Sequence, residues 1–294
     1  MTDLRDLECL VALARHRHFA RAAAECGLSQ PAFSMRIRNL EERLQTPIVR
    51  RGNRFQGLTA AGEAVTAHAR EIIDRLRAME QEARATQGAV AGPLTLAVVP
   101  TAAAHAGRIA VRLMASHPGI RTRIESATSL VVQQGLVEGV YDAGITYTEG
   151  VVADMFRIEP LYAERYVLLA PRPMVPAAAD SIAWADAAAL PLVLLEPGMQ
   201  NRRILSRVFE EIGARPRVVA ETSGFIPALA IVADGVAATV LPEAMAATLG
   251  AFPGVVALPL VAPRVEKAMG LVTLLRPHAL PAVEALRSVL IDPP

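Results

Sequence analysis

The sequence predicts a multidomain α+β protein, and three observations along its 294 residues lead to that fold class. Residues 1–58 hold short helical patterns with many arginines, and residues 59–88 form one helical pattern without proline. Residues 92–294 alternate short apolar runs with helical patterns, which is typical of an α/β domain. We therefore expect a helical N-terminal domain, a long connecting helix and a C-terminal α/β domain.

The distribution of charge points to a polyanionic partner for the N-terminal part. Hydrophobic residues make up 52% of the chain, which is enough for sizeable cores. The net charge is only +1, but residues 1–58 carry ten arginines and six acidic residues, a balance of +4. This concentration of positive charge would attract nucleic acid.

Several classes of protein are disfavoured by the sequence. Cys9 and Cys26 are the two cysteines, and their spacing fits no metal site, so we expect neither a metal nor another cofactor. Their position also excludes a thiol-based redox switch in the C-terminal domain. The acidic residues near the N-terminus are unlike a signal peptide, and the longest apolar stretch is interrupted by Asp234 and Gly235. We expect a soluble cytoplasmic protein that does not contact membranes.

The first 44 residues predict a helix-turn-helix. Two short helical patterns are followed by Gly27, which permits a tight turn, and Ser29 is a candidate N-cap for a third helix with Pro31 in its first turn. The buried side of this third helix repeats at spacings of four, three and four, and consists of Phe33, Ile37, Leu40 and Leu44. Its opposite side is polar and basic, as a DNA-reading helix requires.

That polar side supplies candidate contacts to bases and phosphates. Gln30 can bond to adenine edges, and Ser34 to a base or a phosphate. Pro31 and Met35 can touch thymine methyl groups, and Arg38 is placed for a phosphate or a guanine. Arg36 points nearer to the flank of the domain, where it is either a phosphate contact or a surface charge.

The long helical pattern contains a heptad seam. Its apolar positions alternate between spacings of four and three, and they are Val65, Ala69, Ile72, Leu76, Met79 and Ala83. A narrow stripe on a helix between two domains favours pairing with a second copy of the chain. The alternative is an amphipathic helix that packs on its own domain.

Residues 19–59 form one connected pattern that resembles the winged helix-turn-helix of LysR-type transcriptional regulators. The matching positions are Ala22, Ala23, Leu28, Ser29, Gln30, Pro31, Ala32, Ser34, Ile37, Leu40, Glu41, Leu44, Pro47, Arg51, Arg54, Leu58 and Thr59. Met35 and Gly57 stand where many members carry arginine or another polar residue, so the details of base readout can differ here. Residues 92–100, 117–120, 136–145 and 232–242 are similar to the family's effector-binding domain.

The resemblance implies a sequence-specific DNA-binding transcriptional regulator that is controlled by a small-molecule effector. It implies a DNA-binding domain over 1–58, a linker and dimerisation helix over 59–88, and an effector-binding domain over 92–294. The latter would comprise two Rossmann-like subdomains, similar to periplasmic binding proteins, over 92–161 with 267–294 and over 162–266. The implied partners are operator DNA, the effector, further copies of the chain in a homodimer or homotetramer, and RNA polymerase.

Two other functions fit the sequence less well. A non-catalytic solute-binding protein would explain only residues 93–294, and it leaves the basic head and the heptad seam without a role. An α/β enzyme is disfavoured because the sequence has no GxSxG elbow, P-loop, HExxH motif or dinucleotide fingerprint.

The resemblance adds a wing to the DNA-binding surface. Arg54 is then placed to reach a narrow minor groove, whereas Arg51 is either a DNA contact or part of an ion pair within the domain. The complete set of expected DNA-binding residues is Ser29, Gln30, Pro31, Ser34, Met35, Arg36, Arg38, Arg51 and Arg54.

The effector site is expected in the cleft between the subdomains, beyond the carboxyl ends of the strands. The candidates are Pro100, Thr101, Ala102, Thr128, Ser129, Ile145, Tyr147, Pro197, Gly198, Met199, Asn201, Arg202, Thr222, Ser223 and Phe225. Such small polar residues favour a small metabolite, for example a carboxylate held by backbone N–H groups and hydroxyls, with Arg202 or Arg203 as a partner. Alternatively, the hydroxyls only cap helices and Tyr147 only packs.

Overall fold

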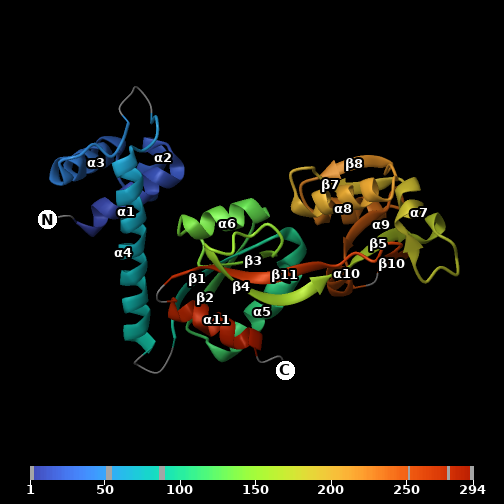
Figure 1. Cartoon of the computed structure of the whole chain (residues 1–294). Helices are drawn as coiled ribbons and strands as arrows, with labels where there is room; N and C mark the ends of the chain where they lie inside the picture. Colours follow the sequence, from blue (N-terminus) through green and yellow to red (C-terminus); the bar gives the residue numbers. More distant parts are fainter. Residues whose placement is uncertain (1–2, 51–54, 86–89, 251, 277–278, 292–294) are drawn as a thin grey trace.

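The structure, a computed structural model, describes residues 3–50, 55–85, 90–250, 252–276 and 279–291. Figure 1 shows a helical head beside a long helix, followed by two α/β lobes. This architecture confirms the multidomain α+β fold that the sequence predicts.

The head is built from three helices, α1 (Leu4–His16), α2 (Phe19–Glu25) and α3 (Gln30–Leu44). Each begins at a side chain that caps its first turn: Asp3, His18 and Ser29, respectively. The apolar faces meet in one core that contains Leu10, Leu13, Phe33, Ile37 and Leu40. The predicted helix-turn-helix is therefore present, with α3 as its second helix.

A short antiparallel contact follows α3. Val49 pairs with Leu58, and the backbone N–H of Arg50 donates to the carbonyl of Gly57 at 3.0 Å. Gly57 has a φ of 108°, which a residue with a Cβ rarely adopts. The predicted wing lies here, but Arg51 and Arg54 fall outside the described residues.

Helix α4 (Ala60–Ala85) leads from the head to the lobes (Figure 1). Its start is fixed where Thr59 Oγ1 accepts from the Gly62 N–H at 2.9 Å. Gly62 is required there, because a Cβ would lie 2.1 Å from the carbonyl oxygen of Ile48. Further along, Ala69 packs against Leu7 and Val11 of α1. Part of the predicted seam is thus buried on the chain's own head.

The first lobe contains a five-stranded sheet in the order β2-β1-β3-β11-β4. Strands β1, β2 and β3 are parallel, and β11 is antiparallel to both β3 and β4. The strands are β1 (Gly92–Val98), β2 (Ile120–Ser126), β3 (Ala143–Tyr147), β4 (Phe156–Glu164) and β11 (Lys267–Leu274). The associated helices are η1 (Pro100–Ala102), α5 (Ala103–Ser116), α6 (Ser129–Val137) and α11 (Pro281–Ile291).

The second lobe contains a four-stranded sheet in the order β6-β10-β5-β9 and a parallel pair, β7 and β8. The strands are β5 (Tyr166–Pro171), β6 (Ile182–Ala183), β7 (Leu192–Leu195), β8 (Val218–Thr222), β9 (Thr239–Pro242) and β10 (Val255–Val261). The helices are η2 (Arg172–Met174), α7 (Trp184–Ala189), α8 (Gln200–Glu211), α9 (Phe225–Ala233) and α10 (Glu243–Leu249).

The chain crosses between the lobes twice, from β4 to β5 and from β10 to β11. Strand β4 stays paired with β11 as far as Glu164, which lies opposite Lys267. The first crossing therefore lies at Arg165, whereas the family resemblance implies a limit between residues 161 and 162. The second crossing lies between Val261 and Lys267.

Candidate DNA-binding surface and effector pocket

Helix α3 presents its N-terminal half to solvent. Ser29 accepts from the Ala32 N–H at 3.4 Å, so its hydroxyl serves the cap. Gln30, Pro31 and Arg38 are exposed, and Ser34 is half-buried. Met35 is 62% exposed. These side chains form one accessible polar and apolar face.

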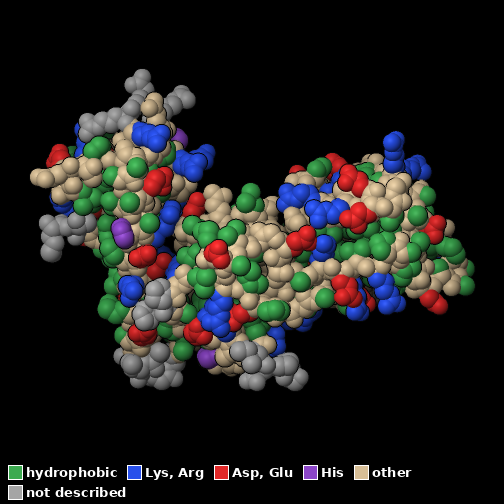
Figure 2. Space-filling model, in the orientation of Figure 1, with side chains coloured by type: hydrophobic (Ala, Val, Ile, Leu, Met, Phe, Trp, Pro, Cys, Tyr) green, Lys and Arg blue, Asp and Glu red, His purple; other side chains and the backbone are tan. Residues whose placement is uncertain are grey.

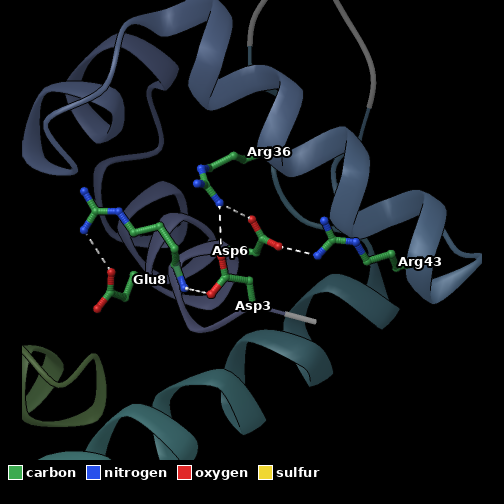
Figure 3. Close-up of polar contacts among 6 residues, drawn as sticks. Asp3, Asp6, Glu8, Arg36 and Arg43 are labelled. Atoms are coloured by element: carbon green, nitrogen blue, oxygen red, sulfur yellow. Dashed lines mark hydrogen bonds and ion pairs between the residues drawn. The ribbon is translucent and has the colours of Figure 1, made fainter. Parts of the chain in front are cut away.

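Arg36 lies apart from this face. Its Nη1 donates to Asp6 Oδ1 at 2.8 Å, and Arg43 donates to Asp6 Oδ2 at 2.5 Å. Figure 3 shows both arginines reaching from α3 to the same carboxylate on α1. The hydrogen bond to Asp6 raises the pKa of the Arg36 guanidinium. Sequence reasoning missed Asp6, because an acidic residue in the first turn of a helix is usually a surface residue.

Glu41 is a second acidic residue that sequence patterning did not single out for a role in the head. Its Oε1 accepts from the backbone N–H groups of Ile48 and Val49 at 2.8 and 3.0 Å. The C-terminal half of α3 is thus tied to the start of the wing.

The two lobes meet at a narrow pocket that leaves only about 10 Å³ of free space. Its walls come from the loops that follow β1, β2, β3 and β7. The lining residues are Val99, Pro100, Thr101, Thr128, Ser129, Tyr147, Leu195, Met199, Gln200 and Asn201. Seven of the predicted effector residues are in this set, since the carboxyl ends of the strands converge as the sheet topology requires.

A hydrogen-bonded chain runs from the pocket into the hinge. Thr101 Oγ1 lies 3.2 Å from the Tyr147 hydroxyl, which donates to Glu164 Oε1 at 2.7 Å. Thr101, Tyr147 and Glu164 are each at most 4% exposed. Because the Tyr147 hydroxyl donates its one proton to Glu164, Thr101 Oγ1 is the donor to Tyr147. The lone pairs of Thr101 Oγ1 can then accept from another group. Burial raises the pKa of Glu164, and the hydroxyl of Tyr147 opposes that rise.

Two polar side chains of the pocket have unused hydrogen-bonding atoms. Asn201 is 4% exposed, and neither its Oδ1 nor its Nδ2 has a partner among the described residues. The same holds for Ser129 Oγ, which is also buried. Buried polar atoms in folded proteins are usually paired, so a ligand that bonds to these groups would relieve an energetic penalty.

Helix N-termini also open on this pocket. Helix α6 begins at Ser129, and its first turn is capped by Thr128 Oγ1, which accepts from the Val131 N–H at 3.4 Å. Helix α8 begins at Gln200 behind Met199, which provides no side-chain cap. Unpaired N–H groups and the helix dipole favour an anion at such positions.

The other predicted effector residues do not line the pocket. Ala102, Ile145 and Phe225 are buried in the lobe cores, whereas Pro197, Gly198 and Ser223 are exposed. Thr222 Oγ1 donates to the carbonyl of Gly224. Arg202 donates to the Leu195 carbonyl and to Glu221, at 2.9 and 2.7 Å, so its guanidinium is engaged within its own lobe.

Ion pairs span the junction of the lobes near this pocket. Glu149, after β3, pairs with Arg207 of α8 at 3.3 Å and with Lys267 at 2.8 Å, and Arg165 pairs with Glu266 at 2.7 Å. Figure 2 shows acidic and basic side chains gathered where the lobes meet. The hydrogen bond from Lys267 lowers the pKa of Glu149.

Neither a metal cluster nor a membrane span is found among the described residues. It contains no group of three or more His, Cys, Asp or Glu residues placed to hold a metal ion. None of its described helices is long and apolar enough to cross a membrane.

A DNA-reading head joined to a two-lobed ligand-binding domain defines a class of protein, the ligand-responsive transcription regulators. Residues 4–63 match the bacterial regulatory helix-turn-helix protein, lysR family, and residues 87–292 match the LysR substrate binding domain. The chain belongs to the LysR family of DNA-binding transcriptional regulators with an effector-binding domain.

Individual relatives extend over nearly the whole chain. The SDS degradation transcriptional activation protein of Pseudomonas sp. (strain ATCC 19151) is 30% identical over 99% of this chain and 96% of the relative. The RuBisCO operon transcriptional regulator of Acidithiobacillus ferrooxidans is 31% identical over 81% of this chain and 77% of the relative.

Solved structures show the same arrangement. A full-length OxyR variant from Pseudomonas aeruginosa matches with a TM-score of 0.74 and 25% identity, over 99% of this chain and 98% of that chain. Full-length CbnR in complex with its target DNA has the same fold, with a TM-score of 0.64 at 22% identity, over 98% of this chain and 99% of that chain.

Proposed function

We propose that the exposed half of α3 reads operator DNA in the major groove. Gln30, Ser34 and Arg38 supply base or phosphate contacts, with Ser29, Pro31 and Met35 beside them. Arg51 and Arg54 reach the backbone or the minor groove from the wing. The exposure of Gln30, Pro31, Met35 and Arg38 on a capped helix supports the assignment to α3. Arg36 is left out of this set because Asp6 engages it.

We propose that two copies pair along α4 and that pairs assemble further into a tetramer. Ile72 and Met79 of the seam are 48% and 58% exposed, so an apolar stripe is available to a second copy. Pairing would place two heads on an inverted repeat, and each half-site would add to the affinity. The assembled regulator acts in the cytoplasm, with RNA polymerase as its partner at the promoter.

We propose that the pocket between the lobes binds the effector without transforming it, and that this effector is a compact carboxylate. The single observation that carries the proposal is Asn201, a buried amide with both polar atoms unpaired, beside helix N-termini that favour an anion. The pocket is nearly closed, with about 10 Å³ of free space, so the two lobes must part to admit such a ligand.

Several relatives are hydrogen peroxide-inducible genes activators, among them one from Escherichia coli at 29% identity. Thiol oxidation in the effector-binding domain is excluded here, because residues 92–294 contain no cysteine. This supports reversible ligand binding as the signal.

In vitro selection from a random duplex library tests the DNA part of the proposal. We expect the purified full chain to enrich an inverted repeat whose half-sites lie a whole number of helical turns apart, about 10.5 base pairs each. Enrichment of a site without symmetry, or of none, would refute paired reading by α3.

A thermal-shift panel of acetate, lactate, succinate and benzoate on the full chain tests the effector part. A ligand at a hundred times its Kd stabilises the folded state by about 2.7 kcal/mol. We expect at least one of these anions to raise the Tm, and Thr101→Val to reduce the rise while the exposed control Thr248→Val does not. If no anion shifts the Tm, the carboxylate assignment is wrong.

A further inference from the structure

The carboxylate of Asp6 is buried inside the head although it lies in the first turn of α1. Its side chain is 1% exposed. A buried carboxylate without partners is strongly unfavourable, so its place in the fold depends on the groups that pair with it. Those groups, Arg36 and Arg43, both come from α3, the helix that presents the DNA-reading face (Figure 3).

The spacing of the two arginines lets Asp6 fix the axial position and rotation of α3. Seven residues are two helical turns, so Arg36 and Arg43 lie on one side of the helix, roughly 10 Å apart along its axis. Both reach back to the same carboxylate, one on each oxygen. Sliding α3 along its axis would lengthen one ion pair while it shortens the other, and rotation would lengthen both.

Helical geometry also points Arg36 and Arg38 in different directions, although they are only two positions apart in the sequence. Residues two positions apart on a helix point about 200° from one another, so Arg36 and Arg38 face nearly opposite directions. Arg38 is exposed and has no ion pair with any residue that the structure describes. The Arg36 side chain is 35% exposed, and its Nη1 also lies 3.6 Å from Asp3 Oδ2.

The pairing also changes the charge that the head offers to DNA. Lys and Arg contacts to phosphates provide nearly all of the sequence-independent affinity. Both arginines are held toward the Asp6 carboxylate and away from DNA, and its negative charge offsets one of their two positive charges. Weaker binding to random sequence raises the ratio of specific to non-specific affinity, the quantity that decides occupancy in a genome.

We propose that Asp6 is a positioning residue for DNA recognition. Its carboxylate fixes the rotation and axial position of α3 through Arg36 and Arg43, and it withholds these two charges from the phosphate backbone. The proposal rests on the proposed placement of α3 in the groove, and it assigns Arg36 to orientation rather than to contact with DNA.

Salt titrations on a random-sequence duplex, for which no operator is needed, test the withheld charge. The slope of log K against log salt falls by about 0.9 for each phosphate contact that is lost. We expect Arg36→Gln to keep the wild-type slope and the matched variant Arg38→Gln to lower it by about 0.9 per head. Arg36→Gln leaves Asp6 paired with Arg43, so the head keeps one of its two ion pairs.

A fall in slope for both variants would overturn the withheld-charge proposal, because Arg36 would then be a phosphate contact. An unchanged slope for both would instead show that α3 does not lie against DNA, which is a failure of the placement and not of the Asp6 assignment. The two failures are thus distinguishable.

Asp6→Asn tests positioning. We expect this variant to lose about tenfold in the ratio of affinity for the selected operator to that for random duplex, the loss of about one base contact. Affinity for random duplex should be unchanged or higher, since charge is released. A merely destabilised head would lose both affinities together, and circular dichroism at the assay temperature reports on that case. An unchanged ratio in a folded Asp6→Asn protein would refute positioning.

Discussion

Asp74 on α4 forms a 2.8 Å ion pair with Arg276, which follows β11 in the first lobe. The two side chains are only 17% and 22% exposed. Nearby, Gln81 Oε1 accepts from the backbone N–H of Ala282 at 3.2 Å. These contacts join the helix that carries the head to the domain that holds the pocket.

The first prediction concerns this connection. Asp74→Asn should lower the stability of the full chain by about 1–2 kcal/mol, between the values for exposed and buried ion pairs. Arg276→Gln should do the same, and the double variant should be little worse than either single one, since the pair is already broken. Thermal unfolding measures all three, with the exposed Asp180→Asn as control. Fully additive losses would show that Asp74 and Arg276 do not interact.

The second prediction concerns pH and Glu164. Burial raises the pKa of Glu164 in the folded state, so the folded state binds the Glu164 proton more tightly than the unfolded state does. This adds stability at low pH, and the added stability is lost as pH rises through the folded pKa. Glu164→Gln removes the titration but keeps an acceptor for Tyr147. The Tm of Glu164→Gln relative to wild type should therefore increase between pH 5 and pH 8. A constant difference across this range would contradict a raised pKa.

The third prediction concerns the unpaired amide in the pocket. Asn201→Leu removes two buried polar atoms that lack partners, so the ligand-free protein should keep or gain stability, by about 1 kcal/mol. The matched variant Thr239→Val removes a buried hydroxyl that donates to the Val193 carbonyl at 2.7 Å, and it should lose stability. Thermal unfolding without added ligand compares the two. If Asn201→Leu is as destabilising as Thr239→Val, the Asn201 amide is not an unpaired group available to bind a ligand.

The fourth prediction concerns self-association. Ile72→Asp and Met79→Asp place a charge in the exposed part of the seam, so each should shift the chain toward monomers. Ala67→Asp introduces the same residue at an exposed position on nearly the opposite face of α4 and should leave association unchanged. Sedimentation velocity at several concentrations reports the assembly state. Equal behaviour of the three variants would place the interface elsewhere.

Local signals made the head predictable from the sequence. Ser29, Pro31 and the spacing of Phe33, Ile37 and Leu40 are enough to start α3 and to choose its buried face. Likewise, Thr101 and Thr128 follow strands and Tyr147 ends one, and the ends of parallel strands gather at one edge of a sheet.

The remaining features depend on contacts between distant parts of the chain. Asp6 is 30 and 37 residues away from its two partners, so its burial leaves no local pattern. Ile145 and Tyr147 are alternate residues of β3, but only Tyr147 lines the pocket. In the seam, Val65 and Ala69 were predicted to face a second copy, and they pack on the head of the same chain instead. The periodicity of a helix does not reveal which neighbour covers it.

The most direct test of the account compares affinities for the selected operator and for random duplex, with wild type and the double variant Gln30→Ala/Ser34→Ala. Base contacts give sequence preference, whereas phosphate contacts do not. We predict that the double variant binds the operator at least tenfold more weakly and binds random duplex as wild type does. An unchanged operator affinity, or an equal loss on both duplexes, would contradict base reading by α3.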